Sequence, residues 1–316
     1  MLISYFDTTI CNDNLGNSII TEGVLDFFDE IFPEAFLIKI PYIEGIESHS
    51  LSYIKRSDFT FFAGTNSLNS HMANYNQWGI TKRNKTHIKD VILCGLGWWQ
   101  YEDEPDEYTK DILYSVLNKN YIHSLRDNYT TNRLRGIGFN NVINTGCPSM
   151  WRLTQEYCAD IPTAKVDSVV VTFTNYNQHP AMDNALMHLL KKLYKNIYLW
   201  VQGPQDYEYG RRLCPEVTIL PPRLSALDDI LRSENIEYVG TRLHAGIRAL
   251  QHKRRATIIG IDNRAIEISR DTNLPVVPRG DWQTLYAHLT SSKPTIINMP
   301  WEAIKLWKSQ FSASSK

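Results

Sequence analysis

Short apolar segments alternate with amphipathic segments along almost the whole chain, and this pattern constrains the fold more than any other feature. The first apolar segment is Met1–Phe6, and the second is Phe36–Pro41, which follows a helical pattern at Ser18–Ile31. Near-continuous apolar strands that alternate with helices are typical of a parallel sheet covered by helices on both faces. Further strands are predicted at 58–63, 90–94, 121–124 and 141–144, with a helix at 109–117.

The same alternation restarts after Asp160–Lys165, a segment with the composition of a linker. The second half is predicted to contain strands at 167–173, 196–201, 216–220, 236–240 and 256–260, and helices at 182–194, 225–231, 245–251, 282–289 and 301–311. At 316 residues the chain has room for two domains. We therefore predict an α/β protein with two Rossmann-like parallel-sheet domains, an N-terminal one at 1–160 and a C-terminal one at 161–316.

Composition excludes several classes of protein. Lys and Arg total 33 and Asp and Glu 34, so the formal net charge is −1, and the chain lacks the basic balance of a dedicated nucleic-acid binder. It contains no apolar run long enough for a transmembrane helix. Its five cysteines are scattered without a C-x-x-C pair, which favours free thiols in a reducing compartment. These features predict a cytoplasmic protein, in solution or at the inner face of the membrane.

The segment Thr241-Arg242-Leu243-His244 lies where a predicted strand ends and a predicted helix begins. Ligands of open α/β sheets bind beyond the carboxyl ends of the strands, beside helix N-termini. The guanidinium of Arg242 can fork onto a phosphate or carboxylate, and His244 can transfer a proton near neutral pH. A surface arginine and a buried core histidine are the structural alternative, but the position at a strand end favours a binding role for the pair.

Two further segments also follow predicted strands. Ser124-Leu125-Arg126-Asp127 offers a second arginine, and Asp127 either orients Arg126 or caps the next helix. The loop Asn12–Asn17 occupies the place of a phosphate-binding turn but lacks the glycine pattern of dinucleotide or NTP sites. An ordinary polar turn explains this loop equally well.

Two candidates carry weaker signals. Trp98 follows Gly97 at a strand end, where its ring either stacks on a sugar or belongs to the core. The acidic loop between Glu102 and Glu107 is a solvated loop more readily than a metal site, so no metal site is predicted.

Taken together and in order, these motifs resemble the polysaccharide pyruvyl transferase family, whose members are phosphoenolpyruvate-dependent ketal-forming transferases. The resemblance spans nearly the whole chain. Its most specific part is the R-L-H-A signature at Arg242–Ala245. One departure is the turn Ala63–Asn66, where the family usually has a G-G-G-type sequence. The segments that carry the resemblance are Asn14–Asn17, Gly64–Leu68, Ser124–Asp127, Gly146–Ser149, Gly240–Ile247 and Ala256–Asp262.

The resemblance implies a glycosyltransferase-B-like (GT-B-like) arrangement with the site between the domains, the acceptor on the side of 1–160 and the donor on the side of 161–316. It implies transfer of the enolpyruvyl group of phosphoenolpyruvate to a sugar of a surface polysaccharide or its precursor, free or lipid-linked, with release of phosphate. His244, Arg242 and Arg126 take the catalytic positions. The expected substrate-binding residues are Asp13, Asn14, Gly16, Asn17, Thr65, Asn66, Trp98, Asp127, Thr241 and Leu243.

The chemistry of this donor agrees with the residue types. Its phosphate and carboxylate can accept bidentate hydrogen bonds, which the guanidinium groups of Arg126 and Arg242 can donate. Ketal formation begins with protonation of the methylene carbon, for which His244 is the candidate general acid. The reaction needs no cofactor and no metal. A GT-B glycosyltransferase that uses a nucleotide sugar, and a non-catalytic glycan- or anion-binding homologue, remain as alternatives.

Overall fold

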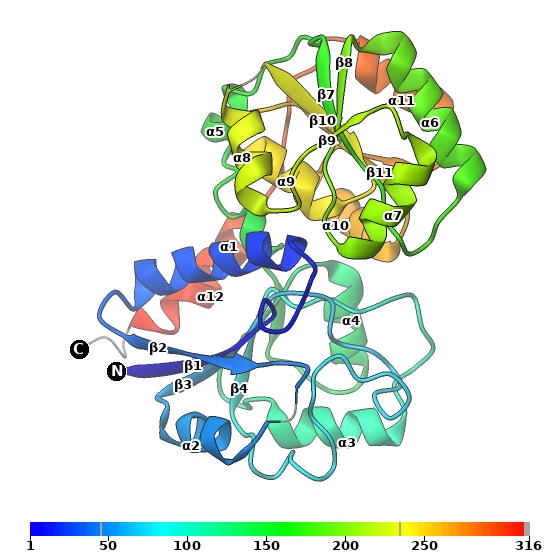
Figure 1. Ribbon diagram of the computed structural model, residues 1–316. Coiled ribbons are helices and arrows are strands. Elements are labelled where there is room, and N and C mark those ends of the chain that lie inside the picture. Colours follow the sequence, from blue (N-terminus) through cyan, green and yellow to red (C-terminus); the bar gives the residue numbers. More distant parts are fainter. Residues whose placement is uncertain (45, 234, 313–316) are drawn as a thin grey trace. The chain divides into compact units, whose positions relative to one another are not determined.

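Parallel strands joined by helices run through the computed structural model, which describes residues 1–44, 46–233 and 235–312. The chain divides into two units (Figure 1). Unit 1 contains residues 1–12, 20–151 and the segment that begins at Met299. Unit 2 contains residues 13–19 and 152–298.

Unit 1 is built on a four-stranded parallel sheet with the order β2-β1-β3-β4, beside a parallel pair formed by β5 and β6. Its strands are β1 (Leu2–Asp7), β2 (Phe36–Pro41), β3 (Phe59–Ala63), β4 (Val91–Cys94), β5 (His123–Leu125) and β6 (Val142–Asn144). Its helices are α1 (Gly16–Ile31), whose first four residues are assigned to unit 2, α2 (Ser48–Arg56), α3 (Glu107–Val116), α4 (Asn128–Gly136) and α12 (Trp301–Ser309), with a 3-10 turn at Pro148–Met150.

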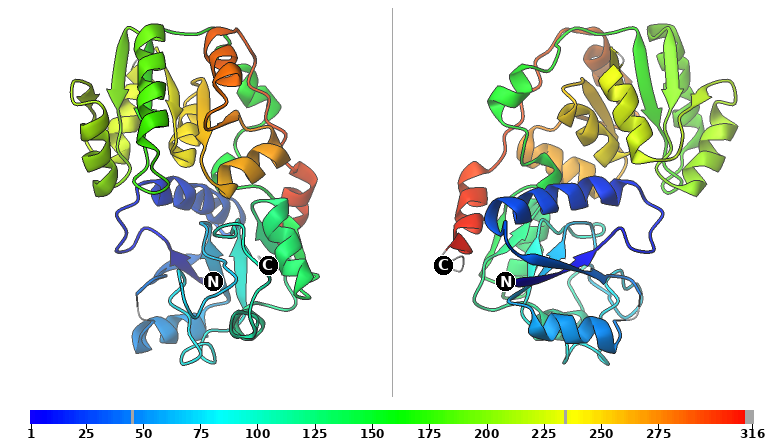
Figure 2. Two further views of the ribbon diagram at one scale, coloured as in Figure 1. Left: turned by 90° about the vertical axis from the view of Figure 1, so that its right-hand side faces the viewer. Right: turned by 60° about the vertical axis from the view of Figure 1, so that its left-hand side comes forward.

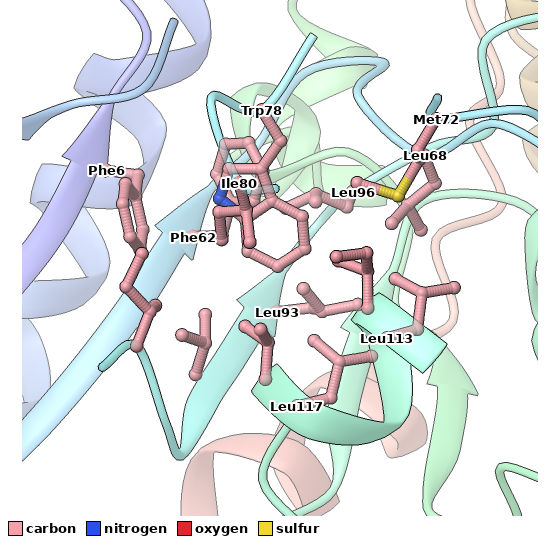
Figure 3. Close-up of a cluster of buried hydrophobic side chains, with 14 of the residues drawn as sticks. Phe6, Phe62, Leu68, Met72, Trp78, Ile80, Leu93, Leu96, Leu113 and Leu117 are labelled. Carbon is pink, nitrogen blue, oxygen red and sulfur yellow. The ribbon is translucent and has the colours of Figure 1, made fainter. Parts of the chain in front are cut away.

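Both faces of the unit 1 sheet are buried along β1, β3 and β4, which explains the continuous apolar sequences of these strands. All five residues of β3 are buried, and successive side chains of a strand point to opposite faces. Phe62 accordingly packs with Phe6 and Trp78 in one cluster (Figure 3), whereas Phe61 packs with Phe27 in another.

The C-terminal helix α12 belongs to unit 1, although the sequence predicts a second domain that extends to residue 316. Trp307 is fully buried, its ring lies 4.7 Å from that of Phe27, and its Nε1 donates to the carbonyl of Ile122 at 2.8 Å. Phe311 joins the same aromatic cluster. The sequence shows that this helix has an apolar face but not which core receives it.

Unit 2 is built on a six-stranded parallel sheet with the order β12-β11-β10-β7-β8-β9. Figure 2 shows its strands and helices in two further views. Its strands are β7 (Ser168–Thr172), β8 (Asn196–Leu199), β9 (Thr218–Ile219), β10 (Ile236–Gly240), β11 (Ala256–Gly260) and β12 (Val276–Pro278). Its helices are α5 (Gln155–Ala159), α6 (Pro180–Leu193), α7 (Pro204–Leu213), α8 (Leu224–Ser233), α9 (Leu243–Gln251), α10 (Asn263–Thr272) and α11 (Trp282–Thr290).

Five helices of the two units are not predicted from the sequence pattern: α2, α4, α7 and α10, in which charged and polar residues dominate, and the short α5. The main segment of unit 1 ends at Trp151, nine residues before the predicted domain boundary at residue 160. Within the described ranges, no helix is both long and apolar enough to cross a membrane.

Candidate functional site

The backbone of the R-L-H signature is fixed at the carboxyl end of β10. Gly240 ends this strand, and a Cβ there would lie 2.3 Å from Thr172 Oγ1, so the close approach of β7 and β10 requires glycine. The amide of Thr241 donates to the carbonyl of Thr172 at 3.0 Å, and the amide of Arg242 to its hydroxyl at 3.2 Å. The Tyr238 hydroxyl donates to the Arg242 carbonyl at 2.7 Å.

The side chain of Arg242 is held by a buried carboxylate that the sequence did not single out. Its Nε donates to Asp206 Oδ2 at 2.8 Å, its Nη2 donates to Asp206 Oδ1, and Nη2 also donates to Asn175 Oδ1 at 3.2 Å. The two side chains are 7% and 1% exposed. Asp206 therefore orients the guanidinium and neutralises its charge, and Nη1 makes no hydrogen bond to the described residues.

Arg264 lies beside the same tyrosine as Arg242. The guanidinium carbons of Arg242 and Arg264 lie 5.0 and 5.3 Å from the centre of the Tyr176 ring. Arg264 also donates to the Tyr176 hydroxyl and forms an ion pair with Asp262. Cations this close to an aromatic ring are attracted to its face.

A third arginine follows the last strand of the sheet. Arg279 Nη1 donates to the carbonyl of Asn177 at 2.5 Å, and its Nη2 lies 3.4 Å from Asp183 Oδ1. Its Nε and Nη2 are buried without a hydrogen-bond partner in the described part of the chain. Unfulfilled guanidinium donors are a feature of anion-binding sites.

The carboxyl edge of the unit 2 sheet therefore carries three arginines, after β10, β11 and β12, around the loop that follows β7. We call Arg242, Arg264, Arg279 and Tyr176 the arginine cluster. Of these residues, only Arg242 is predicted from the sequence. Arg264 and Arg279 carry the same signal, since each closely follows a strand, but β12 was not predicted.

Leu243 and His244 are the first two residues of α9, and both are buried, at 7% and 6% exposure. His244 thus lies in the first turn of a helix, where amide groups point toward an incoming anion. The signature brings Arg242 and His244 to one strand end, as predicted.

Arg126 is 1% exposed and lies in unit 1. Its Nη2 donates to Asn66 Oδ1, and its Nε lies 3.7 Å from Asp127 Oδ2. A Cβ on Gly97 would lie 2.1 Å from Arg126 Nε, so glycine makes room for the guanidinium. Asp127 also caps α4 by accepting from the amide of Thr130 at 2.7 Å. Asp127 therefore caps α4 and also lies within ion-pair distance of Arg126.

The turn after β3 supports this arginine. Thr65 has a left-handed backbone (φ 71°), and its carbonyl accepts from the amide of Gly97 at 2.9 Å. Asn66 donates to the carbonyl of Trp99 at 2.7 Å, which leaves its oxygen for Arg126. The structure therefore brings Asn66, Arg126 and Asp127 together and places Thr65 next to them along the chain.

Trp98 is fully buried and presents no face to a sugar, so the stacking role considered from the sequence is wrong for this structure. Its indole Nε1 donates to Glu102 Oε2 at 2.7 Å, and its ring packs in the core of unit 1. Trp98 is a core residue, which was the other possibility considered from the sequence, because its side chain points into the core at this strand end.

The predicted loop Asp13–Asn17 belongs to unit 2. The amide of Leu15 donates to the carbonyl of Gln202 at 2.9 Å, and Gln202 Nε2 donates to Asn14 Oδ1 at 2.7 Å. Asn14 Oδ1 also accepts from the amide of Gly16 at 3.1 Å, at the start of α1, and Asn17 is buried in that helix. The side chain of Asp13 is exposed.

Among the described residues, no group of three or more His, Cys, Asp or Glu side chains is arranged to hold a metal ion. Acids of the loop near residue 102 have other partners. Glu102 accepts from the amide of Ser70, Asp106 caps α3, and Glu104 pairs with Arg133.

Comparison with known families and structures assigns the class. The family model described as polysaccharide pyruvyl transferase matches residues 14–263, so the chain belongs to that family of transferases. The match includes the R-L-H signature and the Arg126 segment. No curated protein matches the chain significantly.

Solved structures similar to this chain show the fold. An S. aureus MnaA–UDP complex is 11% identical, with 100% of this chain and 97% of that chain covered and a TM-score of 0.53. The Methanocaldococcus jannaschii UDP-GlcNAc 2-epimerase in complex with UDP-GlcNAc and UDP is 9% identical, with 99% and 97% covered and a TM-score of 0.55. The predicted fold class, an α/β protein of GT-B-like type with two Rossmann-like sheets, is confirmed.

Proposed function

We propose that this protein transfers the enolpyruvyl group of phosphoenolpyruvate to a saccharide and forms a pyruvate ketal. The observation that carries the proposal is the position of Arg242 and His244 at one strand end of unit 2, inside the region matched by the family model. A donor with a phosphate and a carboxylate suits a strand end that carries several guanidinium groups.

In this proposal unit 2 is the donor side. Arg242 presents Nη1 to the donor while Asp206 holds its other two nitrogens. Arg279 offers donors that have no hydrogen-bond partner among the described residues. Each of the three arginines has one aspartate within ion-pair distance, so the donor must compete with these carboxylates for the guanidinium groups.

The proposed chemistry proceeds by addition and displacement. His244 gives a proton to the methylene carbon, and one sugar hydroxyl adds to C2 and loses its proton. A second hydroxyl then attacks C2, the bond from C2 to the phosphate oxygen breaks, and the hydroxyl proton passes to the departing phosphate as the ring closes. The guanidinium groups stabilise the negative charge of the departing phosphate. The products are the cyclic ketal and inorganic phosphate, and no redox cofactor takes part.

The direct test is incubation of the full chain with phosphoenolpyruvate and a panel of glycosides. We expect phosphate release and a pyruvate adduct by mass spectrometry. UDP- and GDP-sugars form the second arm, because the similar solved structures contain UDP or UDP-GlcNAc. Glycosyl transfer from a nucleotide sugar without any use of phosphoenolpyruvate would contradict the proposal.

Replacing His244 by Gln tests its role. Gln keeps a hydrogen-bond donor but cannot supply a proton, so we expect kcat to fall by about 10²–10⁴-fold, the usual contribution of a general acid. In D₂O the wild type should place deuterium in the ketal methyl group, and His244→Gln should do so far more slowly. A variant that turns over at the wild-type rate would assign the acid elsewhere.

A further inference from the structure

A cavity of about 460 Å³ lies at the carboxyl end of β8 in unit 2. This volume is within the range of small-molecule sites. Apolar side chains dominate its walls, and two carboxylates, Asp13 and Glu208, are exposed at the same cavity. The apolar part of the wall is formed by Leu15, Val201, Pro204, Tyr207 and Pro222. We call it the Tyr207 pocket.

Hydrogen bonds fix one wall of this pocket. Leu15 is tied to Gln202 through its amide at 2.9 Å, and the side chain of Gln202 donates to Asn14 at 2.7 Å. The loop that precedes α1 is therefore anchored on residues that follow β8. Preformed walls reduce the loss of conformational freedom when a ligand binds.

The pocket is connected to the arginine cluster by one carboxylate. Asp206, in the first turn of α7, accepts from the amide of Gln202 at 3.3 Å and from Arg242 Nε at 2.8 Å. Gln202 lines the pocket, and Arg242 is the proposed donor-binding residue. Asp206 thus contacts both a residue that lines the pocket and the arginine proposed to bind the donor.

The lining favours a neutral sugar ring. The apolar face of a pyranose packs against tyrosine and proline, while its hydroxyls donate to carboxylates. None of the described lining residues is Lys, Arg or His. The two carboxylates disfavour a uronate or a nucleoside diphosphate, and the cation beside Tyr207, Arg211, lies 5.8 Å from the centre of the Tyr207 ring without lining the pocket.

We propose that the Tyr207 pocket binds a neutral pyranose ring of the saccharide acceptor, with Tyr207 as the platform and Asp13 and Glu208 as hydroxyl acceptors. This inference rests on the proposed function for the identity of the acceptor. It adds the residues that hold the sugar and the charge that selects it. It also gives Asp13, which the sequence analysis expected to bind substrate, a specific role.

Sugar binding to the full chain, measured without phosphoenolpyruvate, tests this assignment. The probes are the methyl pyranosides of glucose, galactose and mannose, and methyl glucuronoside as the acidic counterpart, observed by saturation-transfer NMR. We expect at least one neutral glycoside to bind and the glucuronoside to bind more weakly. Tyr207→Ala should weaken the neutral sugar about tenfold, whereas Tyr207→Phe should retain it. Glu208→Gln should reduce the discrimination against the glucuronoside.

Tyr286→Ala is the matched control, because Tyr286 is an exposed tyrosine of α11 in the same unit and does not line the pocket. It should bind sugar like the wild type. The assignment is overturned if no neutral glycoside binds, if Tyr207→Ala binds like the wild type, or if the pocket variants lose UDP instead of sugar.

Assays of pyruvyl transfer distinguish a failure of the pocket assignment from a failure of the proposed function. Unchanged acceptor KM in Tyr207→Ala, with transfer intact, overturns the pocket assignment and leaves the proposed reaction in place. Sugar binding that depends on Tyr207 supports the pocket assignment even when no pyruvyl group is transferred. In that case only the proposed reaction is contradicted.

Discussion

The most consequential residue is Asp206, because it converts Arg242 from a free cation into half of a buried ion pair. Removing one partner of a buried pair leaves the other charge unpaired in a low-dielectric interior, which destabilises proteins by about 3–5 kcal/mol. Arg242→Ala should therefore lower the free energy of unfolding by about this amount, in addition to any effect on donor binding. Arg242→Lys keeps the positive charge but cannot form bidentate hydrogen bonds, so it is the better variant for studies of donor binding.

A double-mutant cycle measured by urea denaturation checks this prediction. The losses for Arg242→Ala and Asp206→Ala should sum to more than the loss for the double variant, by about 1–3 kcal/mol. The exposed pair Arg232–Asp229 in the same unit is the control and should show no measurable coupling. Additive losses at Arg242 and Asp206 would contradict the structure of the pair.

His123 makes stability depend on pH. Burial lowers the pKa of His123 from 6.5 to about 4, and its ring accepts from the amide of Leu93 and donates to the carbonyl of Asn118. The unfolded chain therefore binds a proton at a higher pH than the folded chain does. The stability that neutral His123 contributes is fully present above pH 6.5 and is lost as the pH falls toward 4. This loss lowers the free energy of unfolding by about 2 kcal/mol between pH 7 and pH 5.

Replacing His123 by Asn, which can still accept from Leu93, should flatten this part of the stability profile even if the variant is less stable overall. Denaturant titrations of both proteins at pH 7, 6 and 5 give the comparison. Equal slopes for the two proteins would show that His123 does not cause the loss.

At the level of elements, α12 should stabilise unit 1 rather than unit 2. Trp307 is fully buried against Phe27, so Trp307→Ala should cost about 3–5 kcal/mol. Leu306, on the exposed side of the same helix, provides a control whose substitution by Ala should have little effect. Amide hydrogen exchange should show the loss of protection in β1, β3 and α1. Loss confined to the strands of unit 2 would contradict the assignment of α12.

For the whole molecule we expect activity that does not depend on a divalent cation. The proposed reaction needs no metal, because guanidinium groups can balance the charge of the donor. Pyruvyl transfer after exhaustive EDTA treatment and desalting should match the untreated protein. Activity that disappears in EDTA and returns with Mg²⁺ or Mn²⁺ would overturn this expectation.

The sequence by itself determined the class of fold and the position of the signature. Strands such as Phe59–Ala63 and Ile236–Gly240 consist mostly of apolar residues, which predicts buried parallel sheets. The R-L-H signature could be located because it follows one of these strands. Both inferences depend on local order along the chain, which the pattern of side chains records directly.

Tertiary structure alone decided which distant side chains meet. Asp206 and Arg242 are 36 positions apart, and no local pattern marks Asp206 as the partner of that arginine. Trp98 and Trp307 are buried because of where their elements pack, and the helix that carries Trp307 joins a core formed mostly by the first half of the chain. Local patterns specify strands and helices, whereas ion pairs, pockets and the core that receives the last helix arise from contacts between segments far apart in sequence.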